Sequence, residues 1–387
     1  MKPILTYFII FLFIIYSSFA TPEFSLWTGN RCSACHINPQ GGGMRNDFGW
    51  KFGNDASFFS FKDIGLNPIA EYIDKGDNSF FNGLLSIGTD FRYQSFRSHK
   101  TENATRRYFP MQASLYLSST PLKWLTLQGQ YNIGPLIFPA QKDWSASLIL
   151  KPIDELPSLR VGFFQPAFGL RDCDMTSLDR RVASTDGTAS LIPPDYAELA
   201  LELNYESLDW LSVALGIADS RSLSEISLYG EQLSIVAVKD NPTFTGRLVI
   251  FPKLLEDFLP ESYLGSSLLI NGDFLIINSF IGVALFDDLQ LIFRYSGSNK
   301  YFIRKTDNFI AGLTYSPYKG IFLGVKGEYG ITKHILTDET YIFKTYQIVA
   351  NAKIFILPFV EFIPEYRYID CEEYRSTRWA VQLHLYY

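Results

Sequence analysis

From about residue 82 to the end, apolar and polar side chains alternate along the chain with a period of two. In the segment 198–205, Leu199, Leu201 and Leu203 alternate with Glu202 and Asn204. The same alternation recurs at 85–94, 111–118, 125–133 and 323–331. Because successive side chains of a strand point to opposite faces, each segment predicts a β-strand with one apolar and one polar face.

These strands predict one closed transmembrane barrel rather than a soluble β-sandwich. A sandwich domain typically spans about a hundred residues, whereas here the pattern continues to residue 387 without a linker. Hydrocarbon cannot hydrogen-bond a backbone, so a sheet in a membrane must close on itself. No segment after residue 20 reaches the ~20 apolar residues that a spanning helix needs. We therefore predict an all-β fold, a transmembrane antiparallel β-barrel of about 16 strands, which leaves an open lumen.

The connections between the predicted strands alternate in length. Those at 120–123, 206–209, 286–288 and 316–320 are short, and those at 98–107, 169–195, 296–307, 332–339 and 371–377 are longer and polar. Short periplasmic turns alternate with longer external loops in outer-membrane barrels. The last segment alternates up to Tyr387, which resembles the recognition signal of barrels of the Gram-negative outer membrane. We expect that location, with outer-membrane lipid around the barrel.

The first twenty residues predict a secretory signal peptide. Lys2 precedes an apolar run at 4–16, and Ser18-Phe19-Ala20 resembles a cleavage site. An uncleaved membrane anchor is the alternative. The expected organisation is a signal at 1–20, a small segment at 21–80 and the barrel at 81–387.

Composition narrows the class of partner. The 387 residues carry a formal net charge of −6 and no basic run, which argues against a nucleic-acid partner.

An exported chain favours disulfides, so Cys173 and Cys371 are either a bridged pair or two separate loop cysteines. Acidic residues in the longer connections either attract cations or form a solvated surface. They are Asp172, Asp174, Asp338, Glu339, Glu372 and Glu373.

The motif Cys32-Ser33-Ala34-Cys35-His36 predicts covalent attachment of one haem c. In c-type cytochromes two thiols at this spacing bond the haem vinyl groups, and the adjacent imidazole binds the iron. Three alternatives remain: a redox dithiol, which needs a thioredoxin-like βαβ unit, a zinc site, which needs about four ligands, and a simple disulfide, which leaves His36 without a role.

The sixth iron ligand is open. Met44 follows the run Gly41-Gly42-Gly43, where a turn folds the chain back toward the iron, since glycine tolerates positive φ. Water, Asn46 or a barrel histidine are the other candidates. The barrel histidines are His99, His334 and His384. Arg45 either pairs with a haem propionate or is an exposed cation.

The stretch WTGNRCSACHINPQGGGMRNDFG, residues 27–49, resembles the start of fused monohaem cytochrome c–porin proteins of the bacterial outer membrane. The likeness covers the signal, the Cys32–His36 motif, Phe48-Gly49 and the barrel-like remainder, and residues 159–171 resemble a strand-to-loop element of phosphate-selective porins. The resemblance implies an electron-transfer protein rather than a conventional enzyme. It implies a periplasmic carrier such as a soluble cytochrome, and an extracellular electron donor or acceptor, Fe(II) among them.

A segment of about sixty residues is marginal as a free-standing domain, so we expect residues 21–80 to lie partly inside the barrel as a plug. The main hypothesis is outer-membrane electron transfer through one haem c. The alternative is a diffusion porin in which the haem segment gates or senses. A soluble periplasmic cytochrome with a β-domain is a third, weaker reading.

Overall fold

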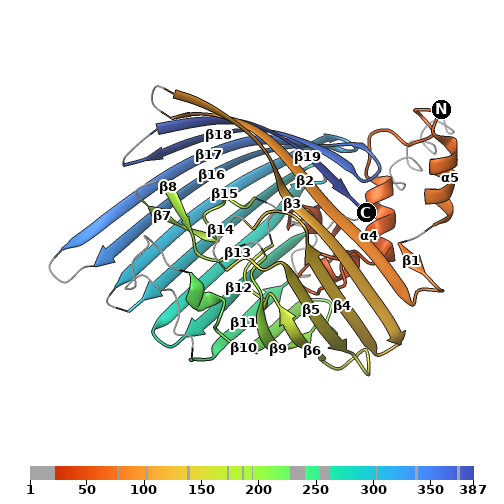
Figure 1. Ribbon diagram of the computed structural model, residues 1–387, viewed down its shortest axis with the longest axis horizontal. Helices are drawn as coiled ribbons and strands as arrows, with labels where there is room; N and C mark the ends of the chain where they lie inside the picture. Colours follow the sequence, from red (N-terminus) through yellow and green to blue (C-terminus); the bar gives the residue numbers. More distant parts are fainter. Residues whose placement is uncertain are drawn as a thin grey trace, which may run out of the picture.

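The computed structural model is a closed antiparallel β-barrel with helices at one end (Figure 1). It describes residues 22–76, 78–100, 103–136, 140–171, 174–184, 187–193, 195–226, 240–252, 261–301, 303–335, 339–372 and 375–387. The expected signal at 1–20 and Cys173 lie outside these residues. The main sheet has 17 strands within the described ranges. One of them, the two-residue β1 (Ser79–Phe80), pairs with the first residues of β2 and is not a strand of the ring. Sixteen strands therefore form the ring, as predicted.

The ring runs in chain order. Its strands are β2 (Leu85–Lys100), β3 (Asn103–Leu122), β4 (Leu125–Asn132), β5 (Trp144–Leu150), β6 (Ser158–Phe164), β9 (Glu198–Tyr205), β10 (Leu211–Ala218), β11 (Thr243–Ile250), β12 (Ser262–Asn271), β13 (Phe274–Phe286), β14 (Leu289–Lys300), β15 (Arg304–Tyr318), β16 (Ile321–Ile335), β17 (Thr340–Leu357), β18 (Val360–Cys371) and β19 (Arg375–Tyr386). Strand β19 pairs antiparallel with β2 and closes the ring. Tyr387 and Thr89 extend this seam by exchanging two backbone hydrogen bonds of 3.0 Å.

The predicted alternation sets the inside and the outside of the barrel. On β9, Leu199, Leu201 and Leu203 are exposed, whereas Glu202 and Asn204 are buried. The same order holds on β11 and β12, whose buried and exposed positions alternate. An apolar outer face and a polar interior suit a barrel surrounded by hydrocarbon, because lipid then covers the apolar side chains.

The two ends of the barrel differ. Tight turns join β3 to β4, β13 to β14, β15 to β16 and β17 to β18 at the end that also carries the helices, which we call the short-turn end. Three predicted long loops were wrong: residues 98–107, 296–307 and 371–377 lie mostly in strands, since β2 reaches Lys100, β14 reaches Lys300 and β19 begins at Arg375. Polar strand ends continue to pair beyond the apolar band, so loss of apolar alternation does not mark the end of a strand.

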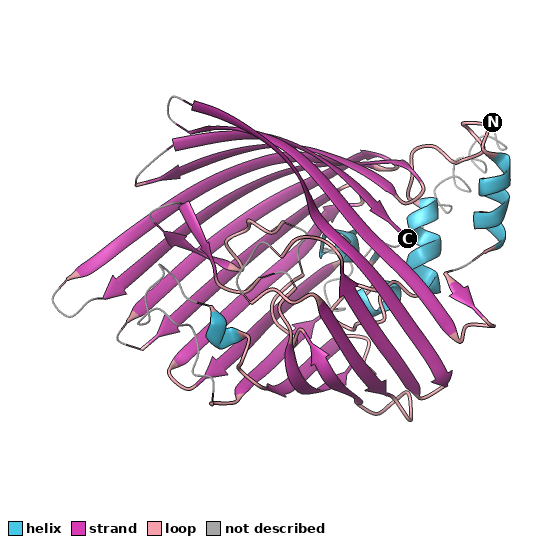
Figure 2. Cartoon of the chain, viewed as in Figure 1, coloured by secondary structure: helices cyan, strands magenta, loops and turns pink. Residues whose placement is uncertain are grey.

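The longest inward excursion connects β6 to β9, and we call it the constriction loop, residues 165–197. It contains the hairpin of β7 (Arg181–Ser184) and β8 (Gly187–Ser190), which pair with each other in a separate small sheet. Figure 2 shows this hairpin inside the ring of strands, where β7 contacts β16 and β17. The loop therefore occupies part of the lumen.

The N-terminal segment forms α2 (Pro22–Thr28), α3 (Cys32–Cys35), α4 (Asp47–Asp55) and α5 (Asn67–Lys75). Phe24 and Trp27 of α2 pack edge-on against the ring of Phe322 in β16, with centroids 5.0 Å apart. Arg31 donates through Nη1 to the carbonyl oxygen of Glu206 at 2.7 Å. Residues 22–55, which we call the lumenal segment, thus pack against the inner wall, whereas α5 lies beyond the barrel end (Figure 1).

The short η1 (Leu223–Glu225) completes the elements. Among the described residues, no helix is long and apolar enough to cross a membrane.

Candidate functional site

The Cys-x-x-Cys-His motif is held by α3 and by the start of α4. The His36 amide donates to the carbonyl of Cys32 at 3.0 Å, and the Asn46 amide donates to the carbonyl of Cys35 at 3.0 Å. The Asn46 side chain accepts from the Gly49 amide at 2.9 Å and so caps α4. Its Nδ2 donates to Ala34 at 3.0 Å. Asn46, considered above as an iron ligand, here joins the two helices.

The triple glycine forms the predicted turn. Gly41, Gly42 and Gly43 have φ values of 80°, 73° and 67°, which glycine adopts without the strain that a Cβ brings. The turn brings Arg45 opposite His36 in an antiparallel bridge. Directly opposed residues of such a pair project to the same face, and their neighbours project to the other.

Met44 accordingly points away from the His36 face. Its side chain is fully buried, with 0% exposed, and its sulfur lies against Gly88 of β2, where an added Cβ would come within 2.9 Å of Sδ. Met44 is not among the described residues that line the cavities beside His36. Its role as sixth ligand stays a prediction that this position does not favour.

Both thiols of the motif are free. Cys35 is 2% exposed, and burial raises the pKa of its thiol to about 12. Burial also raises the pKa of Cys32, against the opposing effect of the nearby Arg247 guanidinium. The alternative of a Cys32–Cys35 disulfide is therefore absent from this conformation.

His36 and Arg45 border a small cavity of about 60 Å³ that we call the histidine cavity. It is also lined by Cys35, Phe52, His384 and Tyr386. The Arg45 guanidinium lies 4.4 Å from the Tyr386 ring centroid, and its Nη1 is buried without a hydrogen-bond acceptor. Arg45 thus faces the same cavity as His36 and is not an exposed cation, whereas its contact with a haem propionate stays a prediction.

One of the three barrel histidines lies in this cavity. His384 of β19 is held between two carboxylates, with Nδ1 2.7 Å from Glu361 Oε2 and Nε2 2.8 Å from Asp90 Oδ1. Both ring nitrogens are therefore occupied, which leaves no lone pair for iron in this arrangement. His99 lies near the last residue of β2 and His334 near the last residue of β16. Both are at the barrel end opposite the short-turn end, away from the motif. The three could not be distinguished from the sequence, because the register of β18, β19 and β2 decides which histidine reaches the site.

The residues present fit a c-type haem. Two free thiols three residues apart lie on one turn of α3, and the adjacent imidazole faces a cavity. Arg45 adds a buried Nη1 donor without an acceptor, which could bind a haem propionate. Such a group would supply one-electron chemistry, held by the two cysteines and His36.

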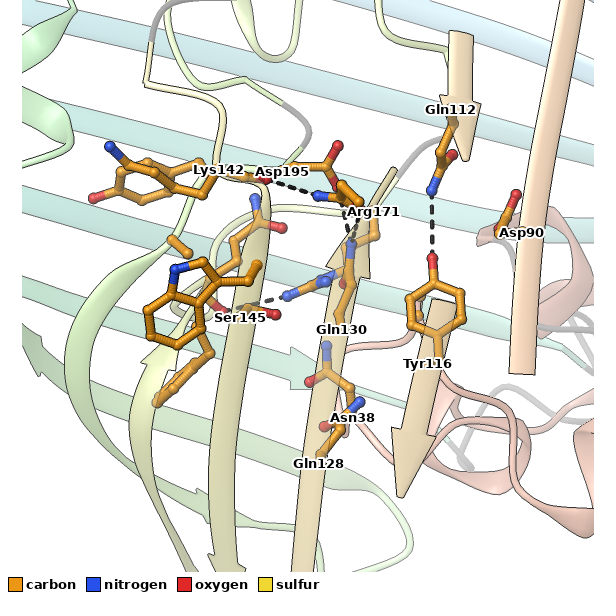
Figure 3. Close-up of a pocket in the computed structure, with 18 of the residues that line it drawn as sticks. Asn38, Asp90, Gln112, Tyr116, Gln128, Gln130, Lys142, Ser145, Arg171 and Asp195 are labelled. Atoms are coloured by element: carbon orange, nitrogen blue, oxygen red, sulfur yellow. Dashed lines mark hydrogen bonds between the residues drawn. The ribbon is translucent and has the colours of Figure 1, made fainter. Parts of the chain in front are cut away.

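A larger cavity, of about 190 Å³, adjoins this site and is shown in Figure 3. We call it the arginine cavity. Its cationic lining consists of Arg45, Arg92, Lys142, Arg160, Arg171 and Arg180, against the carboxylates of Asp90 and Asp195. Arg160 donates to Asn38 Oδ1 at 3.1 Å and to Ser147 Oγ at 3.0 Å, which fixes its guanidinium between the lumenal segment and β5.

The cations of this cavity repel one another. Burial, followed by the charges of Arg180 and Arg160, lowers the pKa of Arg171 in the constriction loop to about 9. A group of positive charges that destabilise each other binds anions well, since an anion relieves the repulsion. Of these cations, only Arg45 was predicted from the sequence as a site residue. The signal was present, because Arg92 and Arg160 fall on the polar, inward face of their strands.

The constriction loop is fastened to the barrel wall. Asp179 accepts from Arg294 Nη1 of β14 at 2.8 Å. The Leu178 amide donates to Glu328 Oε2 of β16 at 2.7 Å. Asp174, considered above as a loop acid facing solvent, instead accepts from Lys326 at 2.7 Å and from Arg367 at 2.6 Å.

A second cavity, of about 190 Å³, also borders the constriction loop. Its lining includes Glu23, Asp174, Arg294, Lys326, Glu365 and Arg378, so charges of both signs face it. Met175 borders both this cavity and the arginine cavity. Met175 of the loop therefore lies between two cavities of different charge.

Comparison with known proteins identifies the fold. OprB of Pseudomonas putida superposes with a TM-score of 0.54 at 12% identity, over 84% of this chain and 97% of that one. The outer membrane channel DcaP of Acinetobacter baumannii gives 0.55 at 11% identity, over 78% and 97%. OmpF of Salmonella typhi, in complex with daunomycin, gives 0.52 at 11% identity, over 78% and 97%. No protein-family model and no curated protein matches the chain. The fold is that of a sixteen-stranded, porin-like outer-membrane barrel.

Proposed function

We propose that the chain is a diffusion channel of the Gram-negative outer membrane that favours small anionic solutes. The observation that carries this proposal is the arginine cavity, in which six cationic side chains face two carboxylates beside the constriction loop of a porin-like barrel. The likeness to the outer membrane channel DcaP supports the membrane and the channel architecture. The cavity supports the charge preference.

The charges select solutes by raising the local concentration of anions and by replacing part of their hydration. Arg160 and Arg171 approach the cavity from different elements, β6 and the constriction loop. An anion between Arg160 and Arg171 contacts fixed guanidinium donors rather than mobile surface lysines. Moderate salt should therefore weaken the anion preference less than it weakens one that depends on exposed charges.

The test is conductance in planar bilayers. We expect stable single-channel currents and, in a KCl gradient, a reversal potential of the sign for anion preference. Arg171→Gln should reduce that preference several-fold, whereas Arg221→Gln, which changes an exposed arginine outside the cavity, should not. A closed barrel without conductance, or a cation preference in the unaltered protein, contradicts the proposal.

The second candidate function is electron transfer through one haem c, and a specific observation favours it. Four groups lie close together near the short-turn end of the lumen: the free thiols of Cys32 and Cys35, the His36 imidazole and the Arg45 guanidinium, whose Nη1 has no acceptor. The cysteines would anchor the group, His36 would bind its iron and Arg45 would hold a propionate. A periplasmic carrier such as a soluble cytochrome, and an extracellular donor such as Fe(II), are the partners that the sequence resemblance implies.

Geometry sets a limit on this second function. The apolar band of an outer-membrane barrel is about 25 Å tall, and the motif lies near the short-turn end, close to the ring of Tyr386. One haem there is closer to a partner at the short-turn end than to one outside the cell. An external donor would have to enter the lumen from the other end.

Membrane fractionation with haem staining on a denaturing gel tests the group itself. We expect covalent haem in the outer-membrane fraction, lost in Cys32→Ser/Cys35→Ser. Reduction of the haem by an external donor across a sealed vesicle supports electron transfer. If haem is present but the donor leaves it oxidised, the haem segment belongs to the channel as a gate or sensor, and His36→Ala should then change the conductance. Absence of covalent haem rejects both haem functions and leaves the diffusion channel.

A further inference from the structure

An apolar groove lies on the outer wall of the barrel, across β14 to β17, with a volume of about 630 Å³. Its floor includes Ala311 of β15 and Gly327 of β16, which are directly opposed. A Cβ added at Gly327 would meet no described atom within 4 Å, so the space above it is open. Phe293 is opposite Ala311 on β14, and Ile348 is opposite Gly327 on β17. Two small residues between two large ones therefore form a depression in the wall.

Aromatic rings border the groove on the side away from the short-turn end. Phe309 and Tyr329 are directly opposed, one outward position beyond the floor. The Tyr295 and Phe309 ring centroids are 5.3 Å apart, and those of Tyr329 and Tyr346 are 4.8 Å apart. Phe309 and Tyr346 are half exposed. Aromatic residues gather where the hydrocarbon of a membrane meets its headgroups, so this row indicates the lipid boundary.

The outer face of β16 gives the same boundary from its length. Its outward positions carry no charge from Ile321 to Ile331, and the next outward position is Lys333. From Ile321 to Ile331 the strand spans about 34 Å, which is about 26 Å of height at a tilt of ~40°. The apolar band of an outer-membrane barrel is about 25 Å tall. Lys333 therefore lies directly beyond the band, at the end opposite the short-turn end.

Lysines of three neighbouring strands gather at this boundary. Lys305 of β15 and Lys333 of β16 are directly opposed, so their side chains project to the same outer face. Lys344 of β17 is opposite Ile331 and is thus a diagonal neighbour of Lys333. All three lysines are exposed. Like charges directly opposed on one face of a sheet destabilise it, so an anion bound between these lysines would stabilise the wall.

The acids near these lysines leave part of the positive charge unpaired. Asp307 Oδ2 lies 3.7 Å from Lys305 Nζ, in an exposed and therefore weak pair. Glu372 is exposed just after β18. Among the residues that the structure describes, Lys333, Lys344 and Glu372 form no ion pair. Two ammonium groups are therefore available to an anion from the membrane.

The strands on the other side of the barrel carry no such cations on their outer faces. In β4 to β6 and β9 to β14 every lysine and arginine is buried on the lumenal side: Arg160, Arg247, Arg294 and Lys300. Basic residues at the lipid boundary are thus a local feature of the wall that also carries the groove. Figure 1 shows β15 to β17 extending to the barrel end opposite the helices.

We propose that the groove and the three lysines form one binding site for a phosphorylated lipid of the outer leaflet. An acyl chain lies over Ala311 and Gly327, and Lys333 and Lys344 bind the phosphate of the headgroup. The leaflet is the outer one, because short turns of such barrels face the periplasm. Gly327 and Lys333 are about 20 Å apart along β16, so one lipid reaches both.

Charge complementarity favours this occupant. Basic side chains beside a membrane attract anionic headgroups, whereas a second copy of this chain would mainly present an apolar outer wall, which does not neutralise the lysines. The inference is independent of conduction and of haem.

Native mass spectrometry of the full, folded chain released from detergent tests the site. The probes are dioleoyl phosphatidic acid and dioleoyl phosphatidylcholine, which share their chains and differ in headgroup charge. Lys333→Gln/Lys344→Gln removes the headgroup contacts. Its matched control is Lys123→Gln/Lys319→Gln, the same change of charge at exposed lysines in turns of the short-turn end.

A second pair of variants tests the groove. Gly327→Leu fills its floor, where the space is open. The matched control is Gly246→Leu on β11, where an added Cβ makes only an ordinary contact of 3.7 Å with Leu215. Heat-modifiable gel mobility confirms that each variant is a folded barrel.

The unaltered protein should retain one phosphatidic acid more tightly than phosphatidylcholine. Lys333→Gln/Lys344→Gln should weaken phosphatidic acid binding about thirtyfold, since each lysine at an anionic lipid surface contributes roughly a factor of five, and should leave phosphatidylcholine unchanged. Gly327→Leu should weaken both lipids, and both controls should stay within about twofold of the unaltered protein.

Three results would overturn the proposal. The first is equal affinity for phosphatidic acid in the lysine variant and its control. The second is displacement of the lipid by an equal concentration of inorganic phosphate, which would show an anion site without a chain. The third is an oligomer without bound lipid that Gly327→Leu dissociates, which would make the groove a contact between copies of the chain.

Discussion

The constriction loop offers the sharpest test of the lumen's organisation, through the ion pair of Asp179 and Arg294. Their side chains are 2% and 4% exposed, and Arg294 Nη1 lies 2.8 Å from Asp179 Oδ2. Asp179→Ala leaves the arginine buried without this carboxylate. Removing one partner of a buried pair typically costs about 3–5 kcal/mol. We take the lower figure, because the backbone carbonyl of residue 179 still accepts from Ser296 Oγ at 3.1 Å.

A cost of about 3 kcal/mol raises the population of the released loop about 100-fold, since each 1.4 kcal/mol is a factor of ten. Limited trypsin digestion measures this population. Arg180 and Arg181 lie in the loop directly after Asp179, so the wild-type protein should resist cleavage there. When loop opening is fast compared with cleavage, the cleavage rate follows the open population. Mass spectrometry of the fragments from folded, reconstituted barrels then gives the rate.

The matched control is Arg221→Ala, which removes the exposed ion pair with Asp219, in which Arg221 is 75% exposed. Such pairs contribute about 0–1 kcal/mol, so cleavage after residues 180 and 181 should change by less than about fivefold. If Asp179→Ala and Arg221→Ala digest at the same rate, the loop is not held by its buried pair and the reasoning fails.

Three further outcomes follow from the site. His384→Leu leaves the carboxylates of Asp90 and Glu361 facing each other without the imidazole between them. Chemical denaturation in detergent should therefore show a loss of about 3 kcal/mol in unfolding free energy. A loss below about 1 kcal/mol would contradict a stabilising role of His384 between the two carboxylates. Met44→Leu should leave the visible spectrum of haem-loaded protein unchanged, because the thioether faces the wall, and a shifted spectrum would make Met44 a ligand. In haem-free Cys32→Ser protein, burial alone should keep the pKa of Cys35 above its ordinary value. Alkylation at pH 8, followed by mass spectrometry, should therefore run more slowly than at an exposed thiol and accelerate as the pH rises. Ordinary reactivity at pH 8 would show that Cys35 is not buried.

The barrel was predictable from the sequence because its pattern is local. Every second residue of a strand such as β9 faces lipid and must be apolar, and sixteen strands follow from counting such segments. Strand ends were less predictable. Residues 98–100 and 103–107 are polar because they lie beyond the hydrocarbon, yet their backbones still pair across β2 and β3.

The candidate site is likewise only partly predictable from the local sequence. The turn at Gly41–Gly43 and the adjacency of Cys35 and His36 follow from the local sequence. The proximity of His384 does not, because it depends on strand closure between residues almost three hundred positions apart. The pairing of Asp174 with Arg367 depends on the inward path of a loop, which an alternating pattern does not describe.

The position of Met175 between two cavities has an electrical consequence. In the proposed channel, ion paths through the cationic cavity and through the cavity of mixed charge would conduct in parallel, and their currents would add. A multivalent anion bound among the arginines would block the first path only. The result would be a fixed residual current rather than full closure, and this residual current would lack a preference for chloride over potassium.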